Sequence, residues 1–207
     1  MKFNWDNIVF QMLGKLVDCV WVSILWVICC IPVFTIGAST TALYYTVHKS
    51  IRGDRGYTTR TFFGAFRDNF KAATLPYLIW LAVMIVLGCD AYITYQVLKT
   101  GSMKGAFFYF FLVMIAVAIM WSAFLFPYIA RFENGIFATL RNALLLAAAH
   151  IPSTIVIVGL SVGSLILTLF TSRSFVIASI IWVFFGFAVL AYVQAFLLCR
   201  IFEKYEK

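Results

Sequence analysis

The sequence predicts an all-α, polytopic membrane protein with five or six transmembrane helices and two amphipathic surface helices. Three observations predict this class: 64% of the 207 residues are hydrophobic, only 12% are charged, and the mean hydropathy is +0.98. Soluble domains rarely reach such values, so lipid is the expected solvent for most of the chain. The short, strictly alternating segments typical of a membrane β-barrel are not found in the sequence, which favours helical spans.

Long runs without Lys, Arg, Asp or Glu define the expected spans. At about 1.5 Å per helical residue, each run is long enough to cover a hydrocarbon core of about 30 Å. The uncharged runs are Cys19 to His48, Gly105 to Ala130, Ile151 to Ser172 and Ser174 to Cys199. One further run, Ala72 to Leu98, contains Asp90 as its only charged residue. We expect spans at about Phe10 to Ile31, Ala38 to Ile51, Thr74 to Leu98, Gly105 to Ala130, Ile151 to Phe170 and Ser174 to Cys199.

The run from Cys19 to His48 is too long for one ordinary span and short for two. In its middle, Pro32 removes a backbone donor and Gly37 loosens the backbone. Hydroxyl groups nearby can replace the lost helical hydrogen bonds; they belong to Thr35, Ser39 and Thr40. We expect the helix to break here and a shorter helix to return. A single kinked span is the alternative, so the run crosses either once or twice.

Basic residues gather beside the spans and predict the orientation. Lys49 to Lys71 holds six of the 16 Lys and Arg residues, and further bases are Arg131, Arg141, Arg200, Lys204 and Lys207. The positive-inside rule places these segments in the cytoplasm, together with both termini if six helices cross the cell membrane. The amino terminus lacks the features of a secretory signal. Anionic lipid headgroups explain the net charge of +8 better than nucleic acid does.

Two segments have the pattern of amphipathic surface helices. Thr59 to Ala73 places four Phe residues at helical spacing with charged residues between them. Phe137 to Asn142 echoes Phe63 to Asp68, and a Pro follows each segment. We hypothesise an internal repeat of surface helix and membrane helix, at about residues 59–98 and 135–170, within a single membrane domain of residues 1–207. A chance match is the alternative.

Gly159, Ser161 and Gly163 fit the GxSxG pattern of serine hydrolases. That pattern needs a sharp strand-to-helix turn, whereas this segment lies inside an uncharged helical run. The two glycines instead predict close helix packing of the GxxxG type. His150 lies eleven residues away, about 16 Å along one helix, and His48 is near another expected helix end. We therefore predict that the chain is not an enzyme, with serine hydrolysis at Ser161 as the exception.

Asp90 is a candidate functional residue, because a carboxylate inside a membrane run needs a partner or a pathway. Solvation near Lys99 is the alternative, and Asp18 is expected to be a solvated or paired helix-end group. The candidate functional residues are Pro32, Thr35, Gly37, Ser39, Thr40, Asn69 and Asp90. The cysteines lack metal-ligand spacing and are expected to be small buried hydrophobic residues. They are Cys19, Cys29, Cys30, Cys89 and Cys199. No metal or cofactor is predicted.

The segment Ile24 to Tyr45, the pair Arg52-Gly53 and the segment Phe62 to Phe70 resemble the YesL-like family of bacterial membrane proteins with a domain of unknown function. The resemblance is strongest from Pro32 to Tyr45 and around Asn69. It implies a Gram-positive protein encoded near sugar-uptake ABC transporters, with no established activity. We accordingly expect a non-enzymatic accessory or assembly component for carbohydrate uptake, with sugar ABC transporter or sensor subunits as partners. A small transporter or channel is the alternative, and the oligomeric state is open.

Overall fold

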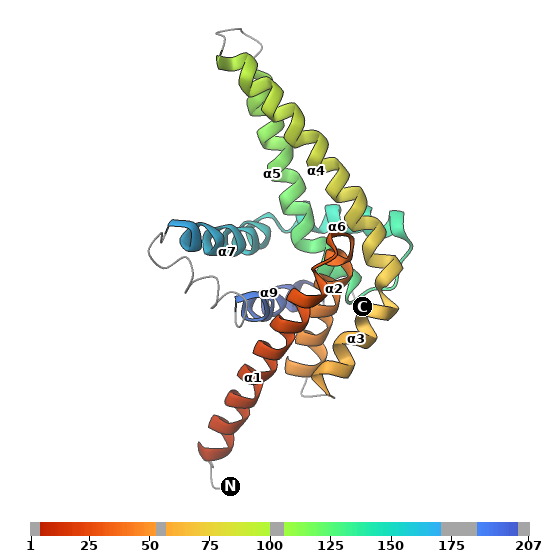
Figure 1. The fold of residues 1–207 in the computed structure, drawn as a ribbon, viewed down its shortest axis with the longest axis vertical. Coiled ribbons are helices and arrows are strands. Elements are labelled where there is room, and N and C mark those ends of the chain that lie inside the picture. The colour runs from red at the N-terminus through yellow and green to blue at the C-terminus, as the bar shows by residue number, and fades with distance from the viewer. Residues whose placement is uncertain (1–4, 53–56, 100–105, 171–185, 203–207) are drawn as a thin grey trace.

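The computed structural model describes residues 5–52, 57–99, 106–170 and 186–202, and all regular elements in these ranges are helical (Figure 1). The prediction of an all-α chain is thereby confirmed. The elements are α1 (Trp5–Cys29), the 3₁₀ turn η1 (Val33–Thr35), α2 (Ile36–Thr46), the π-helical segment η2 (Val47–Arg52), α3 (Thr58–Asp68), α4 (Phe70–Lys99), α5 (Ala106–Ile129), α6 (Ile136–Ala149), α7 (Ile151–Phe170) and α9 (Phe187–Phe202).

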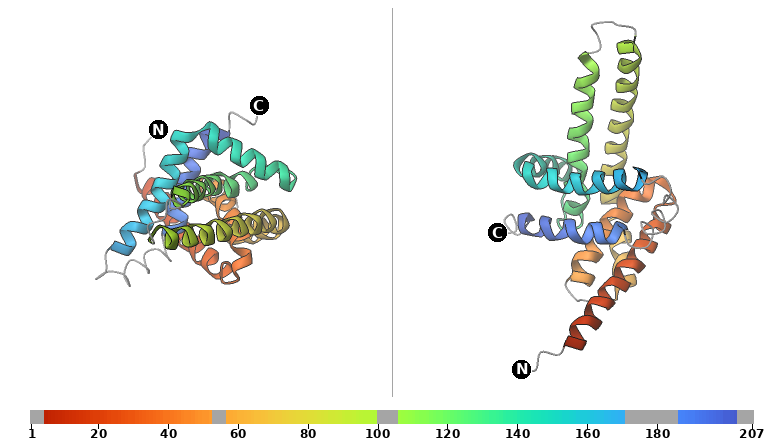
Figure 2. Two further views of the ribbon diagram at one scale, coloured as in Figure 1. Left: turned by 90° about the horizontal axis from the view of Figure 1, so that it is seen from above. Right: turned by 90° about the vertical axis from the view of Figure 1, so that its left-hand side faces the viewer.

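Two of the described helices are long and apolar enough to cross a membrane, over Phe70–Val97 in α4 and Phe107–Ile129 in α5. They pack side by side as an antiparallel hairpin (Figures 1 and 2). Helices α6 and α7 meet at an angle of 99° and count as a third crossing only if the bent pair is one span. The described residues thus contain two or three candidate spans. The five or six expected spans are not confirmed, and part of the last one lies outside the described residues.

The arrangement also differs from a bundle of parallel spans. Helices α7 and α9 lie across the long direction of the α4–α5 hairpin (Figures 1 and 2). The cause of the bend before α7 lies at His150, where the backbone leaves helical geometry with φ −119° and ψ 47°. Pro152 follows as the second residue of α7, where its missing N–H costs no internal helical hydrogen bond.

The expected break inside the run from Cys19 to His48 is confirmed. Helix α1 ends at Cys29 and α2 begins at Ile36, with η1 between them. The role expected for Gly37 was wrong, however, because this residue lies in α2 with no break at it. A Cβ added to Gly37 would lie 2.5 Å from Cβ of Tyr77 and 2.8 Å from the carbonyl oxygen of Ala73. Gly37 therefore permits the close approach of α2 to α4.

Helix α3 is strongly amphipathic, as predicted, but it ends earlier than expected. The sequence pattern suggested one helix to Ala73, whereas the chain turns at Asn69 (φ −95°, ψ 5°) and continues as α4. Phe62 of α3 is fully buried, while Phe63 is 47% exposed. Helix α3 thus packs its apolar side against the protein and not only against lipid.

The buried side chains form two clusters that share Phe66 at their edges. One cluster joins α1, α2, α3 and α9 around Val22, Phe62 and Ala191. The other joins α2, α4, α5, α6, α7 and α9 around Phe124. Phe66 contacts both clusters. Through this residue, α3 links α1 and α2, which we call the amino-terminal hairpin, to the remaining helices.

The hypothesis of an internal repeat can be compared with the positions of the helix breaks. The sequence echo aligns Phe63 with Phe137, and at the same offset Asn69 aligns with Ala143. Asn69 ends α3, whereas Ala143 is buried in the middle of α6. Both halves contain a short amphipathic helix before an apolar one, but the two breaks are not at equivalent positions, and the repeat stays a hypothesis.

Candidate functional site

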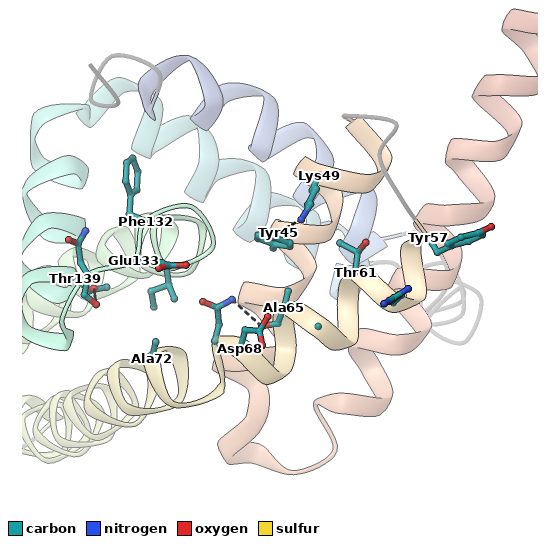
Figure 3. Close-up of a pocket in the computed structure, with 15 residues that line it drawn as sticks. Tyr45, Lys49, Tyr57, Thr61, Ala65, Asp68, Ala72, Phe132, Glu133 and Thr139 are labelled. Carbon is teal, nitrogen blue, oxygen red and sulfur yellow. Dashed lines mark hydrogen bonds between the residues drawn. The ribbon is translucent and has the colours of Figure 1, made fainter.

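An open polar cleft of about 740 Å³ lies between α3 and the connection from α5 to α6 (Figure 3). We call it the polar cleft. Its first wall comes from the end of α2, η2, α3 and the start of α4: Tyr45, Lys49, Tyr57, Arg60, Thr61, Gly64, Ala65, Asp68, Asn69 and Ala72. Its second wall comes from the end of α5 to α6: Ile129, Phe132, Glu133, Asn134 and Thr139.

The first wall is held by hydrogen bonds within and between its side chains. The Lys49 Nζ donates to the Tyr45 hydroxyl at 2.8 Å (Figure 3). Both the backbone N–H and the side-chain Nδ2 of Asn69 donate to the carbonyl oxygen of Ala65 at 3.0 Å. This double contact caps α3 and lets α4 start in a new direction. Asn69, selected from sequence, therefore forms the corner of the cleft.

The second wall is fixed by the buried Tyr128. Its hydroxyl accepts hydrogen bonds from Nδ2 of Asn134 at 2.8 Å and from Nδ2 of Asn142 at 3.1 Å. The Thr139 hydroxyl also donates to the carbonyl oxygen of Asn134, at 3.4 Å. The connection from α5 to α6 is thus tied to the protein core.

Both signs of charge line the polar cleft. Lys49 and Arg60 are cationic, and Asp68 and Glu133 are anionic; all four are exposed. Charged groups in water lose little by staying unpaired, and they can select a partner by electrostatic complementarity. The cleft therefore suits a polar molecule or polypeptide segment that presents both charges.

The candidates between Pro32 and Thr40 build the turn between α1 and α2 and do not line the cleft. The carbonyl oxygen of Cys29 accepts from the Thr35 hydroxyl at 2.6 Å and from the Ser39 hydroxyl at 3.0 Å. Thr40 donates to the carbonyl oxygen of Ile36 at 2.7 Å. The expectation that hydroxyls replace lost helical hydrogen bonds is confirmed for Thr35 and Ser39, which gives them a structural role, whereas Thr40 bonds back within α2.

Asp90 lies in α4, far from the polar cleft along the hairpin arm. It is half-buried, and its carboxylate makes no hydrogen bond or ion pair with the described residues. Its backbone carbonyl accepts from the Thr94 hydroxyl at 2.8 Å. The side chain of Lys99, its expected neighbour, lies outside the described residues. A functional role for Asp90 stays a prediction.

Ser161 belongs to a polar chain between helices. Its hydroxyl donates to the carbonyl oxygen of Ile157 at 3.0 Å and accepts from Nε2 of Gln194 at 2.7 Å. Oε1 of Gln194, in turn, accepts from the Tyr44 hydroxyl. Neither described partner of Ser161 is a base, and the segment is helical, without the strand-to-helix turn of a hydrolase. Sequence reasoning missed Gln194, although an amide inside an uncharged run is a usable signal.

The two glycines beside Ser161 face open space. A Cβ added at Gly159 or Gly163 would meet no atom within 4 Å, other than local helix backbone, among the described residues. The predicted close packing at this pair does not occur with the described helices. A contact with another molecule stays a prediction.

Asp18 is paired, as one form of the expectation had it, but it lies in the middle of α1 and not at a helix end. Oδ1 of Asp18 accepts from the Thr58 hydroxyl at 2.9 Å, at the first turn of α3. The expectation for the cysteines is correct only in part, since Cys19 and Cys199 are buried whereas Cys89 is exposed on α4. Because α4 is a candidate membrane span, an exposed side chain such as Cys89 can contact lipid without being buried in protein.

A comparison with protein families places part of the chain beside a family of unknown function. Residues 19–91 are similar to the family described as "Protein of unknown function, DUF624". The matched segment runs from the second half of α1 into α4, so it includes the turn between α1 and α2, all of α3 and most of the first wall of the polar cleft. No curated protein and no solved structure matched the chain.

Proposed function

We propose that this chain is a non-enzymatic accessory or assembly component of the cell membrane, and that the polar cleft is its contact site for a partner. One observation carries the proposal: an open cleft of about 740 Å³ carries exposed charges of both signs on walls from two distant parts of the chain. Such a surface selects a partner by complementary charge.

The packing of the cleft supports recognition of a preformed shape. Asn69 caps α3, and Tyr128 holds the opposite wall through two asparagines. Because these contacts already order the backbone, a partner does not need to supply that ordering energy. The exposed Arg60, Asp68 and Glu133 then remain at the surface for the partner.

The partner class comes from the sequence resemblance to the YesL-like family, which implies an association with carbohydrate uptake. The partial family match names no activity. We propose a permease subunit of a sugar ABC transporter, or a sensor subunit, as the partner. Both are membrane proteins with cytoplasmic segments that can reach the polar cleft.

The proposed topology has six spans, with both termini and the cleft in the cytoplasm; five spans, the other expected number, would put the amino terminus outside. Support comes from the exposed apolar turn after α1, where Ile31 is 76%, Val33 60% and Phe34 52% exposed. Such side chains are compatible with lipid contact. Single cysteines at positions 35, 102 and 135 in a cysteine-free variant would be labelled from outside intact cells. We expect labelling at 102, and also at 35 if six spans cross; labelling at 135 would contradict the proposal.

Site-specific photo-crosslinking tests the proposed partner in the organism that makes the protein. A benzophenone amino acid at Thr61 points the probe into the cleft, and the same probe at Val86, 59% exposed on α4, is the matched control. We expect a sugar permease or sensor subunit at Thr61 and not at Val86. Charge reversal at Glu133 should reduce that product, whereas Arg141→Glu outside the cleft should not. Equal products at both probe positions would contradict the proposal.

A small transporter or channel is the second candidate, and two observations favour it. Asp90 is half-buried in a candidate membrane helix, and a polar chain joins Tyr44, Gln194 and Ser161 between helices. Ionisable and polar groups in such positions often mark a pathway. Vesicles reconstituted with pure protein should then show flux of a sugar, proton or ion that Asp90→Asn abolishes. Flux equal to that of empty vesicles would eliminate this candidate.

A further inference from the structure

A second cavity, separate in character from the polar cleft, lies between the end of α2 with η2, the end of α5 and the carboxyl-terminal half of α9. Its volume is about 550 Å³, which is within the usual range for small-molecule sites. We call it the basic cavity. It adjoins the polar cleft, because Tyr45 and Lys49 line both.

The described side chains of the basic cavity divide into two chemical kinds. His48, Lys49 and Arg131 supply two permanent cations and one titratable base, and no described lining residue is a carboxylate. Pro127, Ala195 and Leu198 belong to its apolar part. The polar cleft has balanced charges, so a preference for anions distinguishes the basic cavity.

Local contacts position the bases. The Arg131 guanidinium donates to Sγ of Cys199 at 3.3 Å and lies 5.8 Å from the centre of the Phe202 ring. Nε2 of His48 lies 3.6 Å from the same sulfur. Cys199 is buried, so this cluster brings η2, the end of α5 and α9 together at one point.

We propose that the basic cavity binds one anionic phospholipid, with the phosphate at Lys49 and Arg131 and the upper part of an acyl chain along Pro127, Ala195 and Leu198. An anion alone would use only the basic side chains, and an apolar ligand alone would use only the apolar ones. A phosphate ester carrying hydrocarbon satisfies both parts. Basic pockets between membrane helices commonly hold such headgroups. This inference does not depend on the proposed partner.

Lipid titration of the delipidated full chain in a neutral detergent tests the proposal, with native mass spectrometry counting bound lipid. Phosphatidylglycerol should bind as one retained molecule, and phosphatidylcholine of the same chains should bind at least tenfold more weakly. Arg131→Gln should weaken phosphatidylglycerol binding about fivefold, the effect expected for one basic residue. Arg141→Gln removes the same charge from the exposed face of α6 and should change binding less than twofold.

The apolar half is tested without changing the charge. Ala130 lines the cavity at the end of α5 and is only partly buried. Ala130→Leu should reduce phosphatidylglycerol retention while leaving the circular dichroism spectrum unchanged. Glycerol 3-phosphate and inorganic phosphate, titrated into the wild-type protein as competitors, distinguish a lipid site from a simple anion site.

Three results would overturn the proposal. Equal retention of the two lipids by wild-type protein would exclude headgroup selection. Displacement of the lipid by millimolar inorganic phosphate would indicate a free-anion site. Equal loss in Arg131→Gln and Arg141→Gln would indicate general attraction to a basic surface. The wild-type comparisons decide the question even if one substituted chain fails to fold.

Discussion

The close contact at Gly37 permits the most direct test of the fold. We consider the substitution Gly37→Ala, which adds one methyl group at the crossing of α2 and α4. The new carbon would lie 2.5 Å from Cβ of Tyr77 and 2.8 Å from the carbonyl oxygen of Ala73. Ordinary contacts begin at 3.4 Å, so the helices would have to separate by roughly 1 Å. Rotation of a side chain can relieve neither contact. The oxygen of Ala73 is a backbone atom, and Cβ of Tyr77 is bonded directly to the backbone.

Overpacking of a core costs about 1 to 3 kcal/mol. The rigid neighbours place this site at the upper end, at about 3 kcal/mol. Alanine is favoured over glycine inside a helix by about 0.5 to 1 kcal/mol. The expected net loss in the free energy of unfolding is therefore about 2 kcal/mol. The loss should also be visible as weaker coupling between the amino-terminal hairpin and the α4–α5 hairpin.

Denaturant titration in a mild detergent, followed by tryptophan fluorescence and far-ultraviolet circular dichroism, measures this loss. Gly88→Ala is the matched control, because it lies in α4 and its added methyl group would meet no atom within 4 Å, other than local helix backbone, among the described residues. The control should equal or slightly exceed the wild-type stability. If Gly37→Ala and Gly88→Ala unfold within 0.5 kcal/mol of each other, as an order-of-magnitude limit, the reasoning about the helix crossing is wrong.

Three further substitutions test other parts of the fold. Thr35→Val should destabilise the turn between α1 and α2 by about 1 to 2 kcal/mol, because the partly buried carbonyl oxygens of Cys29 and Pro32 lose a donor; proteolysis rates at the turn would report this loss, and wild-type rates would contradict it. Phe62→Ala should cost about 3 to 5 kcal/mol in unfolding titrations, whereas Phe63→Ala, 47% exposed, should cost under about 1 kcal/mol; equal losses would refute the packing of α3. Ser161→Ala should cost about 0.6 kcal/mol, and Gln194→Leu should cost more, because the loss of the amide removes a partner from hydrogen-bonding groups of Tyr44, Ile157 and Ser161; the reverse order in thermal unfolding would contradict the polar chain.

Much of the local structure could be predicted from residue types alone. Pro32 cannot donate a backbone hydrogen bond, and nearby hydroxyls can, so the break between α1 and α2 followed from short-range chemistry. The amphipathic character of α3 likewise followed from a short-range pattern, the spacing of its Phe residues. Its end at Asn69 was missed, because a side-chain cap competes with a helical pattern that continues beyond it.

The polar cleft could not be predicted, because its two walls are far apart in the sequence. Lys49 and Glu133 belong to different connections in the sequence, and only the packing of the helices brings both into one cavity. The same holds for Arg131 with Cys199, and for Ser161 with Gln194. Contacts over such separations leave no periodic signal in a single chain.

The sequence by itself determined that this protein is helical and apolar, where its first long run breaks, and that α3 is amphipathic. These properties depend on backbone chemistry and on patterns within a few turns. Only the tertiary structure decided the directions of α7 and α9, the need for glycine at position 37, and the two cavities. Those features depend on which helices meet, and that outcome is set by side-chain shape summed over the whole core.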